Sequence, residues 1–197
     1  MLDEQEFNSF VRRVRAGDEQ AAADLVRRYE PEIRREVRLR LRDPRLRRDF
    51  DSVDICQSVL ASFFVRAALG QYELERPEQL LKLLVTMARN KLVHQVRKQR
   101  SQRRDNRRLE AAGQEKLASV AGGANPSELV ARQELLQVFR NRMSAEERQL
   151  VELRSQGRDW AEIAAEVGGT AEARRKQLAR ALDRIGQQLG LDEVDSE

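Results

Sequence analysis

Apolar residues recur at intervals of three and four along most of this chain, and this periodicity favours helices over strands. The clearest stripe begins at Cys56 and continues to Ala67, at relative positions i, i+3, i+4, i+7, i+8 and i+11. A second stripe, spaced by four, runs from Leu25 to Leu41. No segment shows the strict alternation of a half-buried strand. The sequence therefore predicts an all-α fold.

Capping residues and glycines mark where the predicted helices begin and end. Asp18 can cap a helix that Asp43 ends, and Asp51 or Ser52 can cap the next, which Gly70 ends. The further helices are expected from about 79 to 100, from 127, from 144 to 157, from 160 to 167 and from 170 to about 189.

Two of the later predicted helices have the strongest capping signals at their N-termini. Ser144 and Glu147 form a capping box, in which each side chain satisfies a free backbone amide of the other residue. Asp159 can cap the short helix that follows. Pro31 lies inside an earlier helix and is expected either to kink it or to mark a break.

Residues 121–126, Ala-Gly-Gly-Ala-Asn-Pro, have the composition of a linker. A domain boundary placed there divides the chain into two small helical bundles joined by a flexible linker. We expect a first bundle at 1–104, the linker at 105–126, a second bundle at 127–190 and an acidic tail at 191–197.

Charge is concentrated in local blocks. The net charge is only +4, but residues 34–48 hold eight arginines and residues 97–108 hold seven basic residues. A polyanion senses the nearest face within a screening length of about 10 Å, so these blocks matter more than the total. Nucleic acid is the favoured class of partner.

Other features exclude several classes of protein. Cys56 is the one cysteine, which rules out an internal disulfide and a cysteine-based zinc site. His94 is the one histidine and lacks partner ligands, so no metal or other cofactor is expected. The chain is charged from Asp3 onward and has no apolar run near the roughly 18 residues of a membrane span. We expect a soluble cytoplasmic protein without membrane insertion.

The second predicted bundle contains the outline of a helix-turn-helix, which is the sequence "DWAEIAAEVGGTAEARRKQLARAL" at 159–182. Gly168 and Gly169 separate an amphipathic segment from an arginine-rich one. The outer face at the start of the last helix presents Thr170, Glu172, Arg175 and Lys176. Side chains at such a position can reach base edges in a major groove. The alternative is the solvated face of a structural three-helix bundle.

Two faces of the first bundle also suggest binding. Opposite the apolar stripe of the helix after Asp51, the residues are weakly polar and resemble a protein-docking surface, although an ordinary weakly polar face remains the alternative. These residues are Asp54, Gln57, Ser58, Ala61 and Val65. The outward face of the next helix combines an amide with cations, which suits contact with phosphates and selected bases. Its residues are Asn90, Lys91, His94, Arg97, Lys98 and Arg100.

Four stretches together carry a resemblance to a known family. They are "DSVDICQSVLASFF" (51–64), "LLKLLVTMARNKLVHQVRKQR" (80–100), "NPSELVARQEL" (125–135) and the opening stretch. In order and spacing they resemble bacterial RNA polymerase sigma factors, most closely the two-domain extracytoplasmic-function group. The resemblance covers about 7–189.

The resemblance implies three contact regions. Segment 51–64 would dock on core polymerase, through Asp51, Asp54, Gln57 and Ala61. The loop 70–79 and the following helix would handle the unstacked strand of the minus-ten element, through Tyr72, Asn90, Lys91, His94, Arg97, Lys98 and Arg100. The last helix would read the minus-thirty-five duplex, through Thr170, Glu172, Arg174, Arg175, Lys176 and Arg180.

The chain departs from the family's pattern at two places. Leu80 and Leu81 stand where the family has an aromatic residue, which weakens a role for base stacking there. Arg174 stands where the family has an aliphatic residue, and it either snorkels or adds a DNA contact.

The leading hypothesis is a non-catalytic promoter-specificity subunit, with core RNA polymerase and promoter DNA as partners. The alternative is a stand-alone helix-turn-helix repressor with an N-terminal dimerisation bundle, although the basic face around Asn90 argues against self-association. An enzyme is disfavoured, because clustered carboxylates, a phosphate loop and a nucleophile–base pair are missing from the sequence. The sequence leaves open whether an anti-sigma factor is a further partner.

Overall fold

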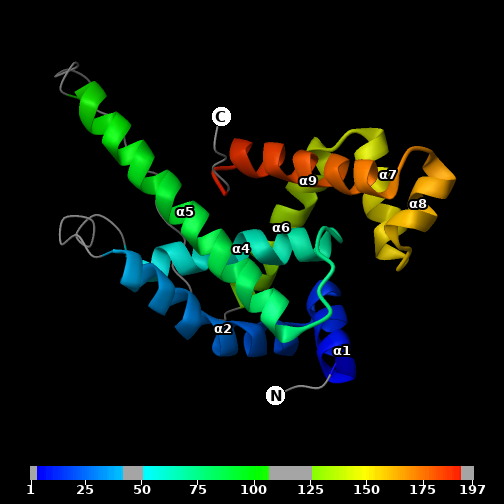
Figure 1. Ribbon diagram of the computed structural model, residues 1–197, viewed down its shortest axis with the longest axis horizontal. Coiled ribbons are helices and arrows are strands. Elements are labelled where there is room, and N and C mark those ends of the chain that lie inside the picture. Colours follow the sequence, from blue (N-terminus) through cyan, green and yellow to red (C-terminus); the bar gives the residue numbers. More distant parts are fainter. Residues whose placement is uncertain (1–3, 42–50, 107–125, 192–197) are drawn as a thin grey trace.

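The computed structural model describes the backbone of residues 4–41, 51–106 and 126–191, and the side chains within these ranges except at 98–106 and 126–132. Every regular element in these ranges is a helix, which confirms the all-α prediction (Figure 1). The helices are α1 (Glu4–Arg15), α2 (Glu19–Arg40), α4 (Ser52–Ala68), α5 (Pro77–Asn106), α6 (Pro126–Arg142), α7 (Ala145–Ser155), α8 (Trp160–Val167) and α9 (Ala171–Gln188).

The helices begin where the capping residues predict. The Asp18 side chain accepts a hydrogen bond from the amide of Ala21 at 2.7 Å, and Asp51 accepts one from the amide of Val53 at 2.9 Å. Each bond satisfies one of the amides that lack a partner at a helix N-terminus. Pro31 lies inside α2, which continues through it without a break.

Four helices, α1, α2, α4 and α5, enclose the first core. Phe7, Leu25, Ile33, Phe63 and Leu84 are fully buried there. Leu25, Ile33 and Phe63 are positions of the predicted stripes. The four helices therefore form one of the two expected small bundles.

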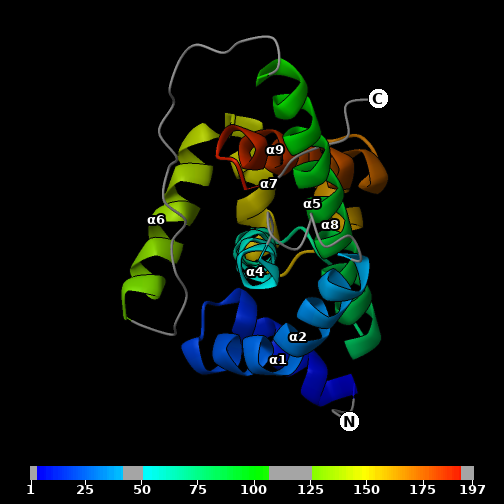
Figure 2. The ribbon, with the colours of Figure 1, turned by 90° about the vertical axis from the view of Figure 1, so that its left-hand side faces the viewer.

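The second core joins α6 to α9 with the outer face of α4. Phe139, Leu150 and Ile163 are buried in it, and so are Val65 and Leu69 of α4. Figure 2 shows α4 between α1 and α2 on one side and α7 and α9 on the other. Two bundles were predicted and two cores are present, but α4 contributes to both of them.

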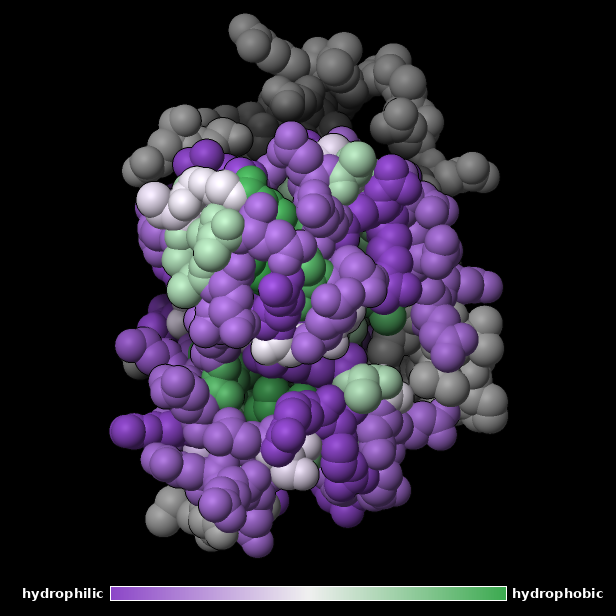
Figure 3. Space-filling view, turned by 90° about the vertical axis from the view of Figure 1, so that its right-hand side faces the viewer, coloured by the Kyte–Doolittle hydropathy of each residue, from purple (hydrophilic) through white to green (hydrophobic). Residues whose placement is uncertain are grey.

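Hydrophilic side chains dominate the face drawn in Figure 3, and hydrophobic surface shows mainly in recesses, including the seam between the upper and lower halves. None of the helices in the described ranges combines the length and the apolar character that a membrane crossing requires. The described residues also contain no cluster of three or more histidine, cysteine or acidic side chains that could hold a metal ion.

Candidate nucleic-acid interface and partner surface

A tight turn between α8 and α9 gives the second bundle its helix-turn-helix geometry. Gly168 and Gly169 adopt φ values of 80° and 86°, in a region that glycine occupies without steric cost. Ile163 on α8 and Leu178 on α9 are both fully buried, so the two helices pack face to face. Ala164 of α8 is also buried, at 8% exposure.

The start of α9 presents an exposed, largely basic face. The Thr170 hydroxyl caps the helix by accepting from the amide of Ala173 at 3.1 Å. Glu172 forms ion pairs with Arg175 at 2.9 Å and with Lys176 at 3.1 Å. Hydrogen bonds from Lys176 and then from Arg175 lower the pKa of Glu172, so this carboxylate stays ionised. Because all three side chains are more than half exposed, solvent can replace these pairs at little cost.

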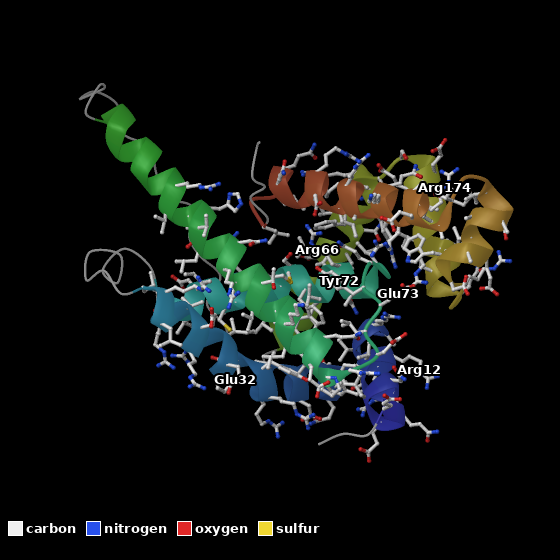
Figure 4. All side chains as sticks on the ribbon, in the orientation of Figure 1. Arg12, Glu32, Arg66, Tyr72, Glu73 and Arg174 are labelled. Atoms are coloured by element: carbon white, nitrogen blue, oxygen red, sulfur yellow. The ribbon has the colours of Figure 1, made fainter. Side chains whose placement is uncertain are left out.

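Arg180 and Arg174 differ in their surroundings. Arg180 is exposed on the next part of α9. Arg174 is half-buried and turns back toward the end of α8 (Figure 4), where it donates to the carbonyl oxygens of Gly168 at 2.8 Å and Val167 at 3.0 Å. The sequence predicts that Arg174 either snorkels or adds a DNA contact. The structure shows its side chain held within the second bundle.

The predicted docking face of α4 is only partly accessible. Asp51 and Asp54 are exposed, and Gln57 and Ala61 are half-buried. The expectation that Val65 continues this outward face is wrong, because Val65 is fully buried in the second core. The C-terminal bundle therefore covers the last turns of α4 and leaves the first turns open.

The predicted outward face of α5 is also divided. Asn90 and Arg97 are exposed as expected. The expectation of exposure is wrong for Lys91 and His94, each only 9% exposed. For Lys91 the cause is the segment just after α9, since its ammonium donates to the carbonyl oxygens of Leu191 at 2.8 Å and Gly190 at 3.3 Å. The side chains of Lys98 and Arg100 lie outside the described residues.

Tyr72 lies in the loop that connects α4 to α5, and its ring packs inward. It stacks on Phe63 with ring centroids 5.8 Å apart and an interplanar angle of 7°. Its hydroxyl lies 3.8 Å from the Met87 sulfur, and its carbonyl oxygen accepts a hydrogen bond from Arg15. The loop is thus anchored to the first core through this ring.

Arg66 is a contact residue that the sequence analysis did not single out. It is 5% exposed, and its guanidinium donates to Asp183 of α9 at 2.8 Å and to Gln71 at 3.0 Å. Figure 4 places Arg66 close to Tyr72 at the centre of the molecule. A single arginine inside the apolar run 59–69 is the signal that could have found it, because a buried charge needs a partner.

Arg154 of α7 is the second such residue. Its guanidinium donates to the carbonyl of Gly70 at 3.2 Å, pairs with Glu73 at 3.4 Å and lies 4.8 Å from the ring centroid of Trp160. Burial lowers the pKa of this guanidinium, and the Glu73 charge opposes that shift. Gly70 has a φ of 77°, and a Cβ on it would lie 2.7 Å from the Cβ of Arg154. The α4–α5 loop therefore lies directly against α7.

The fold and these surfaces define a helical protein that contains a helix-turn-helix. The second helix of this motif exposes cations at its N-terminal turn, as in the class of helix-turn-helix proteins that bind duplex DNA. The family model described as ECF sigma factor matches residues 4–190, nearly the whole chain. The chain belongs to this family, one of non-enzymatic transcription regulators, and so is a sigma factor with a role in transcription initiation. Comparisons with curated proteins and with solved structures give no match.

Proposed function

We propose that this sigma factor binds core RNA polymerase through the first turns of α4 and directs it to promoters with two elements. In this proposal Asp51, Asp54, Gln57 and Ala61 form the polymerase contact. The exposed residues of α5, with Asn90 foremost, contact the minus-ten element. The supporting observation is that Asp51, Asp54 and Asn90 are exposed on helices whose inner faces pack in the first core, while Gln57 and Ala61 are half-buried.

The start of α9 supplies the proposed minus-thirty-five contact. Arg175 and Lys176 are exposed in the first turns of the helix, where a major groove admits side chains to base edges. Arg180 lies further along and reaches the phosphate backbone. The single observation that carries the proposal is this exposed basic turn, following a two-glycine turn, in a chain whose family match spans both bundles.

The proposed function requires the two bundles to separate. Val65 of α4 is buried in the second core, and Lys91 of α5 bonds to carbonyls just after α9. A polymerase surface wider than the first turns of α4, and Lys91 on the minus-ten face, therefore cannot engage while that cover is in place. Linking two modest DNA contacts through one chain raises avidity only if both can reach the promoter at once. The structure described here is then the closed form of the free protein.

Holoenzyme assembly provides the test. Core polymerase is mixed with the chain, and complex formation and duplex binding are measured separately. Formation of a complex that selects promoters, with weak binding of the free chain to duplex DNA, supports the proposal. A free chain that binds duplex tightly and does not associate with core polymerase would instead support the repressor.

A further inference from the structure

Arg174 occupies a position on the inner side of α9. It lies four residues before Leu178 and seven before Ala181, both of which are buried against α8 and its neighbours. Its two neighbours in sequence, Arg175 and Lys176, are turned by about 100° and 200° around the helix and are exposed. The three consecutive cations therefore do not share one face.

Every nitrogen of the Arg174 guanidinium has an acceptor within the second bundle. Nε donates to the Gly168 carbonyl at 2.8 Å, one terminal nitrogen donates to the Val167 carbonyl at 3.0 Å, and the other donates to the Gln177 side-chain oxygen at 2.7 Å. A planar guanidinium with a fixed fork of donors suits this arrangement, whereas a lysine ammonium could not hold all three acceptors in the same geometry.

The bonds to Val167 and Gly168 meet a need that the turn creates. Gly168 ends α8 with φ 80° and ψ 169°, so the chain leaves the helix abruptly and its last carbonyl oxygens have no following turn to supply donors. A cation at a helix C-terminus also interacts favourably with the helix dipole. Arg174 supplies both the donors and the charge from the start of the next helix.

Gln177 extends the contacts of Arg174 to a third helix. Its side-chain nitrogen donates to Glu146 of α7 at 3.1 Å. Arg174 thus links the end of α8, the first turns of α9 and, through Gln177, the start of α7. This network and the buried side chain of Leu178 together hold the start of α9 against α8 and α7.

We propose that Arg174 is a positioning residue for minus-thirty-five recognition: it sets the orientation of α9 so that Arg175 and Lys176 meet base edges, and it does not itself contact DNA. This inference rests on the proposed role of α9 as the duplex reader. It gives a specific function to an arginine that stands where the family carries an aliphatic side chain.

The test uses holoenzyme made with the complete chain and a promoter carrying the preferred minus-thirty-five element. Arg174→Met keeps the length of the side chain and removes all three hydrogen bonds. We expect promoter affinity to fall by about 10- to 150-fold, the loss expected from removing a hydrogen bond to a charged group. The slope of log affinity against log salt should stay at its wild-type value, because no phosphate contact is lost.

Arg180→Met is the matched control on the same helix. As a phosphate contact its loss should flatten the salt dependence by about one unit. A slope for Arg174→Met that flattens in the same way would overturn the proposal, because it would make Arg174 a DNA contact. An unchanged promoter affinity for Arg174→Met would overturn it as well.

Three further variants keep the result interpretable if Arg174→Met loses structure. Gln177→Met should reduce promoter affinity less than Arg174→Met does. The two losses of affinity should not add in the double variant, because the two residues belong to one hydrogen-bond network. Additive losses would contradict the proposal.

Arg174→Lys keeps the charge, so we expect a reduced promoter affinity with an unchanged salt slope. A wild-type affinity for this variant would contradict the need for a guanidinium. If wild-type holoenzyme itself shows no minus-thirty-five preference, it is the proposed function that fails.

Discussion

The contact between Arg66 and Asp183 offers a way to open the closed form without touching a proposed polymerase or DNA residue. Asp183→Asn keeps the size of the side chain and removes its charge. Arg66 then stays buried at 5% exposure without a carboxylate beside it, although the new amide oxygen, Gln71 at 3.0 Å and Ser62 at 3.3 Å can still accept its hydrogen bonds. The closed form is destabilised, whereas in an open form Arg66 would be exposed to solvent and would need no partner.

The magnitude follows from the unequal burial of the pair. The Arg66 side chain is 6% exposed and that of Asp183 is 44% exposed. Breaking a fully buried pair costs about 3–5 kcal/mol, and an exposed pair is worth about 0.2–1 kcal/mol. We therefore expect about 1–2 kcal/mol for Asp183→Asn, which is a factor of roughly 5–30 in the equilibrium between closed and open forms.

The assay is the affinity of the chain for core polymerase. If only the open form docks, the apparent dissociation constant scales inversely with the open fraction, so Asp183→Asn should tighten binding by roughly 5- to 30-fold. The matched control is Asp24→Asn, which removes an exposed 3.0 Å pair with Arg27 inside α2 and should leave the affinity unchanged. An Asp183→Asn affinity equal to or weaker than wild type would refute the closed form as a barrier to docking.

Three further predictions concern the proposed contacts. Asp54→Arg should abolish core binding while circular dichroism shows the same helicity, and normal holoenzyme formation would remove Asp54 from the interface. Asn90→Ala should reduce promoter melting, measured by permanganate reactivity of thymines, with core binding unchanged; normal melting would exclude its role. Arg175→Ala and Lys176→Ala should each change base preference at one position at a cost of about 1–3 kcal/mol, while Arg180→Ala should weaken all promoters alike. If each of the three α9 variants changes the output of every promoter in a library by the same factor, the helix does not read bases.

Local features of the fold could be predicted from the sequence because their causes lie within a few residues. Ser144 and Glu147 form the expected capping box, with bonds of 3.2 and 2.8 Å. Asp159 likewise caps α8 by accepting from the amide of Glu162 at 2.8 Å. Such bonds join residues three apart, so the spacing of residue types is enough to predict them.

The exposure of the candidate site depended on contacts between residues far apart in the sequence. Lys91 bonds to carbonyls 99 and 100 residues away, and Arg66 bonds to a carboxylate 117 residues away. A helical stripe predicts which residues share a face, but it does not predict which other helix covers that face. The stripe therefore places Val65 on an outward surface, although the second core buries it.

Transcription in vitro with core polymerase, followed by mapping of the start sites, tests the central claim most directly. We expect core polymerase to start at defined positions only when this chain is added, downstream of a shared pair of promoter elements. The contradictory result is a chain that leaves core polymerase without defined start sites and protects a palindromic duplex on its own. That outcome would assign the helix-turn-helix to a repressor.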